Sequence, residues 1–381
     1  MEIYTVRPGD NVDRIAARFG VPVEALLYDN QLSRPYPLAV GQALLIPSGT
    51  PDPLRPKIVA GGYAYPYIRR EVLEETLPWL SDLYVFSYRF SEQGDLLPPE
   101  ADDRFMTELA LQQNVRPILT LTPFNADGSF DSSLIHALLS SPAAQERLIG
   151  QLADALRQKG FWGVDIDFEY VYARDREAYP AFVAKVRRAV RAVNENYRVS
   201  VALSAKTSAS QKGLLYEGLD YRALGEAADS ALLMTYEWGY AYGPPMAIAP
   251  INEVRRVVEY ALTEIPAHRL DLGIPNYGYD WPLPFRQGET KATAVTLQYA
   301  VQLAIENDAA IRFDEASMSP HFRYRKNGTE HEVWFEDVRS LREKFSLLAE
   351  YDLRGAGYWQ IMRLFFPNWI LLSDTFRPEK G

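Results

Sequence analysis

From residue 57 onward, short apolar segments alternate with longer amphipathic ones. The amphipathic runs, such as 142–160 and 178–197, repeat apolar residues at helical spacing, and the short segments have the length and the β-branched and aromatic content of buried strands. The strand candidates are KIVAGGYAY (57–65), DLYVFSYRF (82–90), RPILTLTPF (116–124), GVDIDFEYV (163–171), RVSVALSAK (198–206), SALLMTYEW (230–238), RLDLGIPNYGY (269–279) and GAGYWQI (355–361). This alternation predicts an α/β fold, a (β/α)8 barrel of the TIM type rather than an open doubly wound sheet.

One interval, 281–335, departs from this rhythm. It contains a helical run from Thr296 to Glu306, and then Asn327-Gly328 between alternating aromatic and β-branched residues, which is a strong hairpin signal. We expect a small α+β insertion here, between the seventh and eighth strands of the barrel.

The first 48 residues follow a different pattern. Two short strands, Ile3 to Val6 and Ala43 to Ile46, flank two short helices, and Asn11 is placed to cap the first of them. Residues 46–57 then hold four prolines and a glycine, a composition typical of a boundary. We expect a βααβ domain at 1–48, a linker at 49–56 and the barrel at 57–381.

Composition and charge narrow the possible functions. A net charge of −10 without any basic run argues against nucleic acid as a partner, and the absence of cysteine excludes disulfides and thiolate metal sites. The four histidines lack metal-ligand spacing and the chain has no GxGxxG or Walker pattern, so we expect neither metal nor cofactor.

No apolar run is long enough to span a membrane. MEIYTVRPGD lacks the features of a signal peptide, so secretion by the usual route is not expected. The oligomeric state stays open.

Three acids alternate with apolar residues in GVDIDFE, residues 163–169. Strand side chains alternate, so Asp165, Asp167 and Glu169 face one side and their apolar neighbours the other. In a barrel the apolar side packs under the helices while the acids line the interior, with Glu169 at the carboxyl-terminal mouth. Carboxylates this close cannot all ionise cheaply, so we expect a shared proton and a raised pKa at Glu169, as a general acid requires.

The segment GFWGVDIDFE resembles the DxxDxDxE signature of family 18 glycoside hydrolases, with Trp162 in place of the first acid. Strand parity puts that position on the face opposite the other three. LLMTYEWG (232–239) resembles the sixth-strand motif of the family and GAGYWQI the eighth-strand tryptophan, and the resemblance covers residues 57 to about 375. A closer likeness, in MTYEWGYAYGPPMAIAP, PNYGYDW and VWFEDVRSL, is to the spore cortical-fragment-lytic branch of the family.

This resemblance implies a role for each matching residue. Glu169 is the implied acid, Asp167 holds the acetamide of the substrate, Asp165 shares its proton, and Tyr236 orients the acetamide oxygen. Trp359 is the implied floor beneath the sugar, although a core tryptophan or tyrosine is the alternative reading for Trp359 and Tyr236. Residues near the strand mouths that can shape the cleft are Glu237, Trp238, Tyr277 and Asp280.

The first domain resembles a LysM module in YTVRPGDNVDRIAARFGV (4–21) and LAVGQALLIP (38–47). Such modules bind glycans that contain N-acetylglucosamine, and the implied contacts are Gly9, Asp10 and Asn11 in one loop and Asn30 to Leu32 in the other. The alternative is that Gly9 and Asp10 only form a turn and a cap. The module is interpreted as a tether that raises local substrate concentration.

Taken together, the residues and the resemblance favour a retaining, substrate-assisted N-acetylglucosaminidase of peptidoglycan. The expected substrate is spore cortex fragments during germination, and the expected location is the coat or the layers near the cortex. A chitinase or an endo-N-acetylglucosaminidase acting on other glycans is one alternative. A non-catalytic glycan-binding barrel is the other, and the intact Glu169 argues against it.

Overall fold

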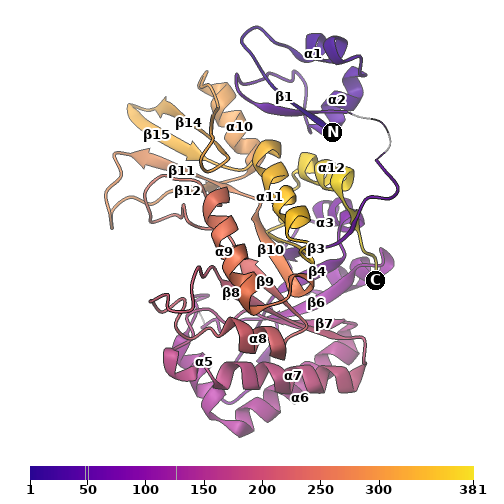
Figure 1. Ribbon diagram of the computed structural model, residues 1–381, viewed down its shortest axis with the longest axis vertical. Coiled ribbons are helices and arrows are strands. Elements are labelled where there is room, and N and C mark those ends of the chain that lie inside the picture. The colour runs from indigo at the N-terminus through magenta and orange to yellow at the C-terminus, as the bar shows by residue number, and fades with distance from the viewer. Residues whose placement is uncertain (48, 50, 126) are drawn as a thin grey trace.

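A computed structural model of the chain describes residues 1–47, 49, 51–125 and 127–381. A small N-terminal module sits at one end of the molecule, a barrel forms the other end, and an insertion projects from the side of the barrel beneath the module (Figure 1). Ser48 and Thr50, at the predicted boundary and in the predicted linker, lie outside the described residues. In the part of the chain that is described, no helix has the length and apolar character needed to cross a membrane.

The N-terminal module has the predicted βααβ order. It consists of β1 (Glu2–Thr5), α1 (Val12–Phe19), α2 (Val23–Asp29) and β2 (Ala43–Ile46), and β1 pairs antiparallel with β2. Asn11 caps α1 by accepting a hydrogen bond from the Arg14 backbone N–H at 2.9 Å. The first strand begins and ends one residue earlier than predicted.

The eight predicted barrel strands are all present and parallel, which confirms the predicted fold. Strand β3 pairs with both β16 and β4, and these two pairings close the barrel. The barrel strands are β3 (Lys57–Ala64), β4 (Asp82–Phe90), β6 (Arg116–Leu121), β7 (Gly163–Ile166), β8 (Arg198–Ser204), β9 (Ser230–Met234), β10 (Leu270–Pro275) and β16 (Gly355–Trp359). Two short strands, β5 (Leu96–Leu97) and β17 (Arg377–Pro378), pair with β4 and β3.

Helices surround the barrel and bury its outward-facing apolar side chains. Val164, Ile166 and Phe168 of the acidic segment belong to the same buried core as residues of the covering helices. Between successive barrel strands, or after the last, lie α3 (Arg70–Thr76), η1 (Leu77–Trp79), α4 (Arg104–Gln112), α5 (Ser132–Ser140), α6 (Pro142–Lys159), η2 (Ala173–Asp175), α7 (Ala178–Val193), α8 (Tyr221–Ala227), α9 (Ile251–Glu264), η3 (Ala267–Arg269), α11 (Val338–Glu350) and α12 (Phe366–Thr375).

The insertion is a five-stranded antiparallel sheet with one helix, α10 (Leu297–Glu306), and it starts at Gly278 rather than at residue 281. The hairpin of β14 and β15 turns at Asn327 and Gly328, both with positive φ, as this dipeptide predicts. The sheet order is β12 (Thr293–Val295), β11 (Gly278–Leu283), β15 (Thr329–Trp334), β14 (Ser319–Lys326) and β13 (Arg312–Asp314).

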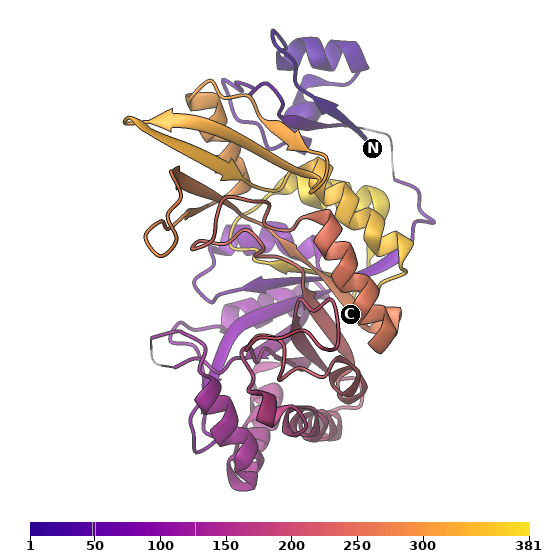
Figure 2. The ribbon, with the colours of Figure 1, turned by 60° about the vertical axis from the view of Figure 1, so that its left-hand side comes forward.

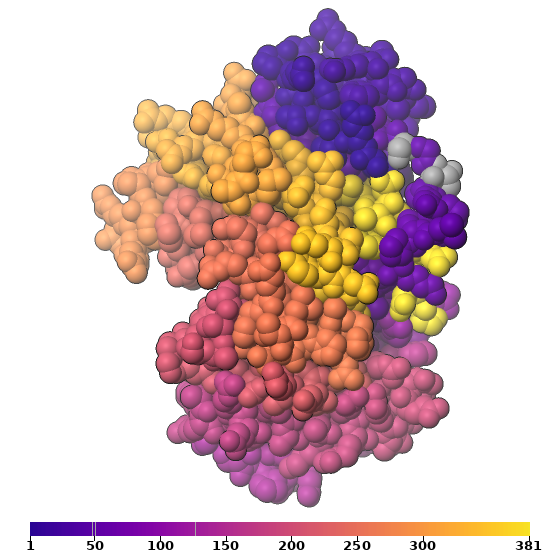
Figure 3. All heavy atoms as spheres, viewed as in Figure 1, coloured from indigo at the N-terminus to yellow at the C-terminus, as the bar shows by residue number. Residues whose placement is uncertain are grey.

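The module is docked on the barrel and not held by the linker alone. Its loop between α2 and β2 lies against the insertion, where the Ile311 backbone N–H donates to the Val40 carbonyl at 2.8 Å. Arg339 of α11 donates to the Gly41 carbonyl at 3.2 Å, and the Phe366 N–H donates to Oε1 of Gln31 at 2.9 Å. The space-filling view shows the module seated on this part of the barrel (Figure 3). The module is therefore fixed to the barrel, while its interpretation as a tether to the glycan stays a prediction.

Gly41 is the tightest point of this contact. Its φ is +84°, and a Cβ built there would lie 1.8 Å from the Ile311 carbonyl oxygen. We expect Gly41→Ala to separate the module from the insertion and to speed proteolysis in the linker. Gly20→Ala is the matched control, because Gly20 has a φ of +66° but nothing within 4 Å, so it carries only the backbone cost of about 1 kcal/mol. Equal proteolysis rates for the two variants would contradict the docking.

Candidate active site

The predicted carboxylates lie inside the barrel at the end of β7. Asp165 is fully buried, Asp167 is 6% exposed, and Glu169 is half-buried at the carboxyl-terminal mouth. Strand alternation thus places the acids inward and their apolar neighbours under the helices, as the sequence predicts. The strand itself ends at Ile166, so Asp167 and Glu169 extend beyond its hydrogen-bonded part.

Asp165, the deepest acid, is fully hydrogen-bonded. Ser200 donates its hydroxyl to Oδ1 at 2.6 Å and Tyr63 donates its hydroxyl to Oδ2 at 3.0 Å. Burial raises the pKa of Asp165 to about 6, although these two hydrogen bonds favour the ionised form. Neither partner was predicted, because the sequence does not show that β3 and β8 bring their side chains to this point.

Asp167, one layer above, has no such support. Burial raises its pKa well above the usual range, and the neighbouring Glu169 and Asp165 raise it further. Its Oδ1 is buried and accepts no hydrogen bond from any described residue. A buried carboxyl oxygen without a donor is an available acceptor for a ligand N–H.

Glu169 is the outermost of the three acids. Burial raises its pKa to about 7, with a further contribution from Glu237. A carboxyl with this pKa can donate a proton near neutral pH and accept one afterwards. The three acids therefore form a column in which protons are retained at pH values where isolated carboxyls are ionised.

A cavity of about 760 Å³ opens above this column. In the space-filling view a notch separates the insertion from the lower part of the barrel (Figure 3). Among the residues proposed from the sequence, Asp167, Glu169, Tyr236, Glu237, Trp238 and Trp359 line the cavity. Asp165 lies beneath it, and neither Tyr277 nor Asp280 is part of its lining.

Tyr236 follows β9 and points into the cavity beside the acids. Its position depends on Gly273 of β10, where an added Cβ would lie 2.8 Å from Cε1 of the Tyr236 ring. Burial raises the pKa of the Tyr236 hydroxyl, and Asp167 and Glu169 raise it further. The hydroxyl thus keeps its proton and is available as a hydrogen-bond donor.

Trp359, at the end of β16, forms part of an aromatic cluster at the cavity. Its ring meets the edge of Phe86 at 4.8 Å between centroids and lies 5.9 Å from Tyr63. The side chain is half-buried and lines the cavity, so a ring face borders the space above the acids. Such a face is suited to stacking on an apolar surface of a ligand.

These features agree with what comparisons of the whole chain find. Residues 124–363 match the glycosyl hydrolases family 18, and residues 4–47 match the LysM domain. The chain belongs to glycosyl hydrolase family 18. It is a glycoside hydrolase with an N-terminal LysM module.

The family 18 chain also resembles individual proteins over its full length. It is 39% identical to the cortical fragment-lytic enzyme of Bacillus subtilis, across 100% of this chain and 99% of that protein. A putative sporulation-specific glycosylase of Bacillus subtilis, YdhD, is 34% identical across 99% of this chain and 88% of its own length. The crystal structure of the Bacillus cereus spore cortex-lytic enzyme SleL superposes with a TM-score of 0.82 at 36% identity, over 99% of this chain and 87% of that one.

Glu237 is held at the cavity rim of the family 18 barrel by two tyrosines. Its φ is +68°, a left-handed conformation that costs free energy for a residue with a side chain. Tyr277 and Tyr279 both donate to its Oε1, at 3.1 and 3.0 Å. Tyr277 therefore acts through Glu237 rather than from the cavity wall, and Tyr279 is a partner that the sequence did not reveal.

Two expectations about position are wrong. Asp280 lies in β11 of the insertion, where it accepts hydrogen bonds from Tyr324 at 2.6 Å and from Nδ1 of His331 at 2.9 Å, because the insertion begins before this residue. Trp162 lies before β7 and not within it, so strand parity does not apply. It packs against barrel-interior side chains and lines a hollow at the amino-terminal end.

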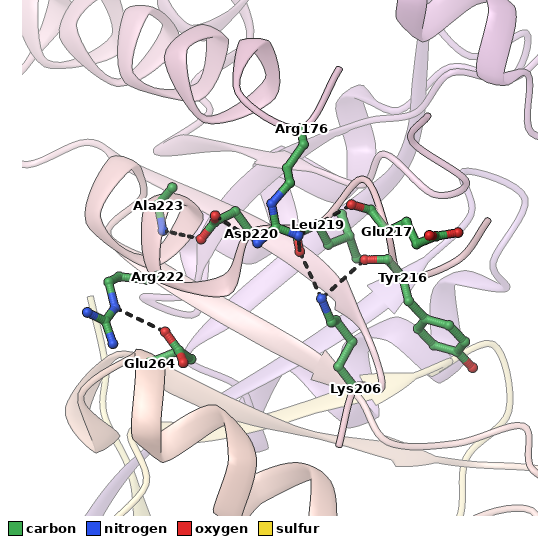
Figure 4. A network of polar contacts seen from close by, with 9 residues as sticks. All are labelled: Arg176, Lys206, Tyr216, Glu217, Leu219, Asp220, Arg222, Ala223 and Glu264. Carbon is green, nitrogen blue, oxygen red and sulfur yellow. Dashed lines mark hydrogen bonds and ion pairs between the residues drawn. The ribbon is translucent and has the colours of Figure 1, made fainter. Parts of the chain in front are cut away.

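The loop between β8 and α8 forms a wall of the cavity that the sequence did not indicate. Leu215 and Tyr216 line the cavity from this loop. Lys206, 1% exposed, donates to the carbonyls of Tyr216 and Leu219 at 3.2 and 3.0 Å, and Arg176 donates to the Leu219 carbonyl at 3.1 Å (Figure 4). Burial, together with Arg176, lowers the pKa of Lys206. These cations fix the backbone of the wall.

The predicted glycan contacts of the LysM module serve first as structural residues. Gly9 has a φ of +83°, Asp10 accepts from the Tyr4 hydroxyl and the Arg7 N–H, both at 2.7 Å, and Asn11 caps α1. This is the turn and cap of the alternative reading.

The second predicted loop of the module is partly committed to internal contacts. The two amide hydrogens of Asn30, which is buried, bond to the carbonyls of Leu26 and Leu45 at 2.9 and 2.7 Å. Gln31 bonds to Phe366, and Leu32 is half-buried. Among the described residues no group of three or more His, Cys, Asp or Glu side chains is placed to hold a metal ion.

The raised pKa of Glu169 predicts that this residue destabilises the family 18 fold at alkaline pH. Between the unfolded value of 4.5 and about 7 the folded state binds more protons, so the free energy of unfolding falls as pH rises through this window. We expect Glu169→Gln to be more stable than wild type by on the order of 1–3 kcal/mol at pH 8, and the difference to vanish below about pH 4.

Denaturant unfolding at a series of pH values measures this difference. The exposed Glu195, in the turn before β8, supplies the matched control Glu195→Gln, which should follow the wild-type curve. Parallel curves for wild type and Glu169→Gln would show that the fold does not raise the pKa of Glu169.

Proposed function

We propose that the chain is a retaining β-N-acetylglucosaminidase that hydrolyses peptidoglycan, with fragments of spore cortex as its substrate during germination. One observation carries this proposal. The column of Asp165, Asp167 and Glu169 supplies one acid with a pKa of about 7 and, one layer deeper, a second carboxyl that lines the same cavity and has one unpartnered oxygen. The choice of substrate comes from two relatives, which are named for cortex fragments and for the spore cortex.

Protonated Glu169 donates its proton to the oxygen of the glycosidic bond. The attacking atom is the carbonyl oxygen of the 2-acetamido group on the same sugar, so the C1–oxygen bond breaks as a new C1–oxygen bond closes an oxazolinium ring. Because the cleft supplies the proton and the substrate supplies the nucleophile, no second carboxylate needs to attack.

Asp167 and Tyr236 orient the acetamide group for this attack. Asp167 accepts the acetamide N–H at its free oxygen and offsets the positive charge that develops on the ring. Tyr236 keeps its proton and donates it in a hydrogen bond to the acetamide oxygen, which holds that oxygen beneath C1.

Asp165 and Trp359 support this arrangement from below and from the side. Asp165, with Ser200 and Tyr63 as fixed donors, shares the proton of Asp167 as charge develops above it. Trp359 stacks on the C–H face of the sugar and excludes water.

Deprotonated Glu169 then removes a proton from a water molecule that attacks C1. The oxazolinium ring opens, the acetamide is restored, and the configuration at C1 is retained after two inversions. We place this activity in the spore, in the coat or near the cortex, on the strength of the relatives named for the spore cortex.

Mass spectrometry of cortex fragments after incubation with the enzyme tests the proposal. We expect wild type to produce new N-acetylglucosamine reducing ends, and Glu169→Gln to lose about 10²–10⁴-fold in rate, the usual contribution of a general acid. Glu195→Gln, at the other end of the barrel, should match wild type.

The same fragments after chemical N-deacetylation should resist wild type, because the nucleophile is missing. If deacetylated fragments were cleaved as fast as the acetylated ones, the substrate-assisted mechanism would be excluded. Bound but uncleaved fragments with every variant would leave a glycan-binding barrel instead.

A further inference from the structure

A second cavity, of about 470 Å³, lies where the LysM module meets the barrel. One side is the loop between α2 and β2 of the module, from Asn30 to Pro37. The other side is helix α10 of the insertion, with the start of α11 and the segment after β16. Figure 2 shows α10 and this module loop facing each other. The loop that holds Gly9, Asp10 and Asn11 does not contribute, so this cavity is separate from a groove between the two module loops.

The lining of this cavity presents little net charge to a ligand. Leu32, Val301, Ile305 and Phe365 supply apolar surface. Each charged side chain of the lining has an opposite charge beside it: Asp337 pairs with Arg339 at 2.6 Å, Glu336 with Lys344 at 2.8 Å, and Arg34 with Glu24 at 3.5 Å. The two carboxylates in the buried part of the lining are thus paired with cations, whereas Arg34 is mostly exposed, so the buried part favours a neutral ligand.

Amide groups supply the polar surface. Gln42 is 6% exposed, its Oε1 accepts from the Ala39 N–H at 3.1 Å, and its Nε2 donates to no described residue although it lines the cavity. Gln298 of α10 also lines the cavity, and its amide has no hydrogen-bond partner among the described residues. A ligand carbonyl or hydroxyl can accept from these amides without breaking a hydrogen bond that the described residues already make.

We propose that this cavity binds a neutral, N-acetylated segment of a glycan chain. Amides converge on an apolar concave surface at a domain interface, which is where small-ligand sites occur, and the volume lies within their usual range. An acetamido sugar offers hydroxyl and carbonyl acceptors for the free amide donors of Gln42 and Gln298, and a methyl group and C–H faces for the apolar side chains. The identity of the polymer rests on the proposed function; the class of ligand rests on the lining.

The docking of the module fixes where this second site lies relative to the catalytic cavity. Because Val40, Gly41 and Gln31 fix the loop to the barrel, the site keeps a constant position relative to the catalytic cavity. A glycan held at both places is bound with an effective concentration set by that fixed span and not by a flexible linker. The module thereby contributes a site that exists only in its docked position.

Methyl NMR of the full chain carrying Glu169→Gln, titrated with the N-acetylglucosamine tetramer, tests the proposal. Methyl groups of Val301 and Ile305 report on the second cavity, and those of Leu215 report on the catalytic cavity. We expect both sets to shift with saturating behaviour. Shifts of Leu215 alone would overturn the second site and leave the proposed function standing, whereas silence of both sets would count against both.

Two substitutions locate the binding. Gln298→Trp fills the cavity, so the Val301 and Ile305 response should weaken at least tenfold. Tyr299→Trp is the matched control, because Tyr299 is 45% exposed on the same helix but does not line the cavity, and it should leave the response unchanged. Gln42→Glu keeps the acceptor for Ala39 and removes the free donor, so it should also weaken the response. An unaltered response in Gln298→Trp, with the melting temperature preserved, would overturn the proposal.

Discussion

Asp165, Asp167 and Glu169 stand on the inner side of β7, where burial penalises their ionised forms and each carboxylate repels the next. The arrangement is stable only if the fold keeps protons on the column or offsets the charge. Ser200 and Tyr63 offset it at the bottom, whereas nothing described offsets it at Asp167. Asp165, the deepest acid, therefore loses its proton most easily, and the two acids above it keep their protons to higher pH. A proton donor at the mouth of the barrel requires this order.

A closed barrel makes this gradient possible. The apolar half of the acidic segment packs against the helices, so the strand cannot rotate its carboxyls toward solvent without losing Val164, Ile166 and Phe168 from the core. The walls of the cavity are fixed in a similar way, by Tyr277 and Tyr279 at Glu237 and by Lys206 within the loop after β8. The positions of the β7 carboxylates therefore depend on the packing of β7, and the positions of the cavity walls depend on hydrogen bonds from the two tyrosines and the lysine.

Much of this architecture is readable in the sequence because it is local. Short apolar segments between amphipathic runs located all eight strands, Asn11 and Asn327-Gly328 marked a cap and a turn, and the alternating acids of β7 indicated the site. What escaped prediction depends on contacts between distant segments. Tyr63, Ser200 and Tyr279 become partners only when the barrel closes, and Asp280 was misplaced because the apolar pattern of β10 continues into β11. The docking of the module likewise involves backbone carbonyls, which carry no residue-specific signal.

Carbon-13 NMR of the carboxyl groups, followed as a function of pH in the free wild-type enzyme, tests the central claim most directly. The account predicts that the Glu169 carboxyl titrates near pH 7 and that its titration perturbs the Asp167 signal, because the two are coupled. If all three carboxyls titrated independently below about pH 5, as exposed carboxyls do, the fold would hold no proton at the mouth of the barrel. The column could not then supply the acid on which the proposed reaction depends.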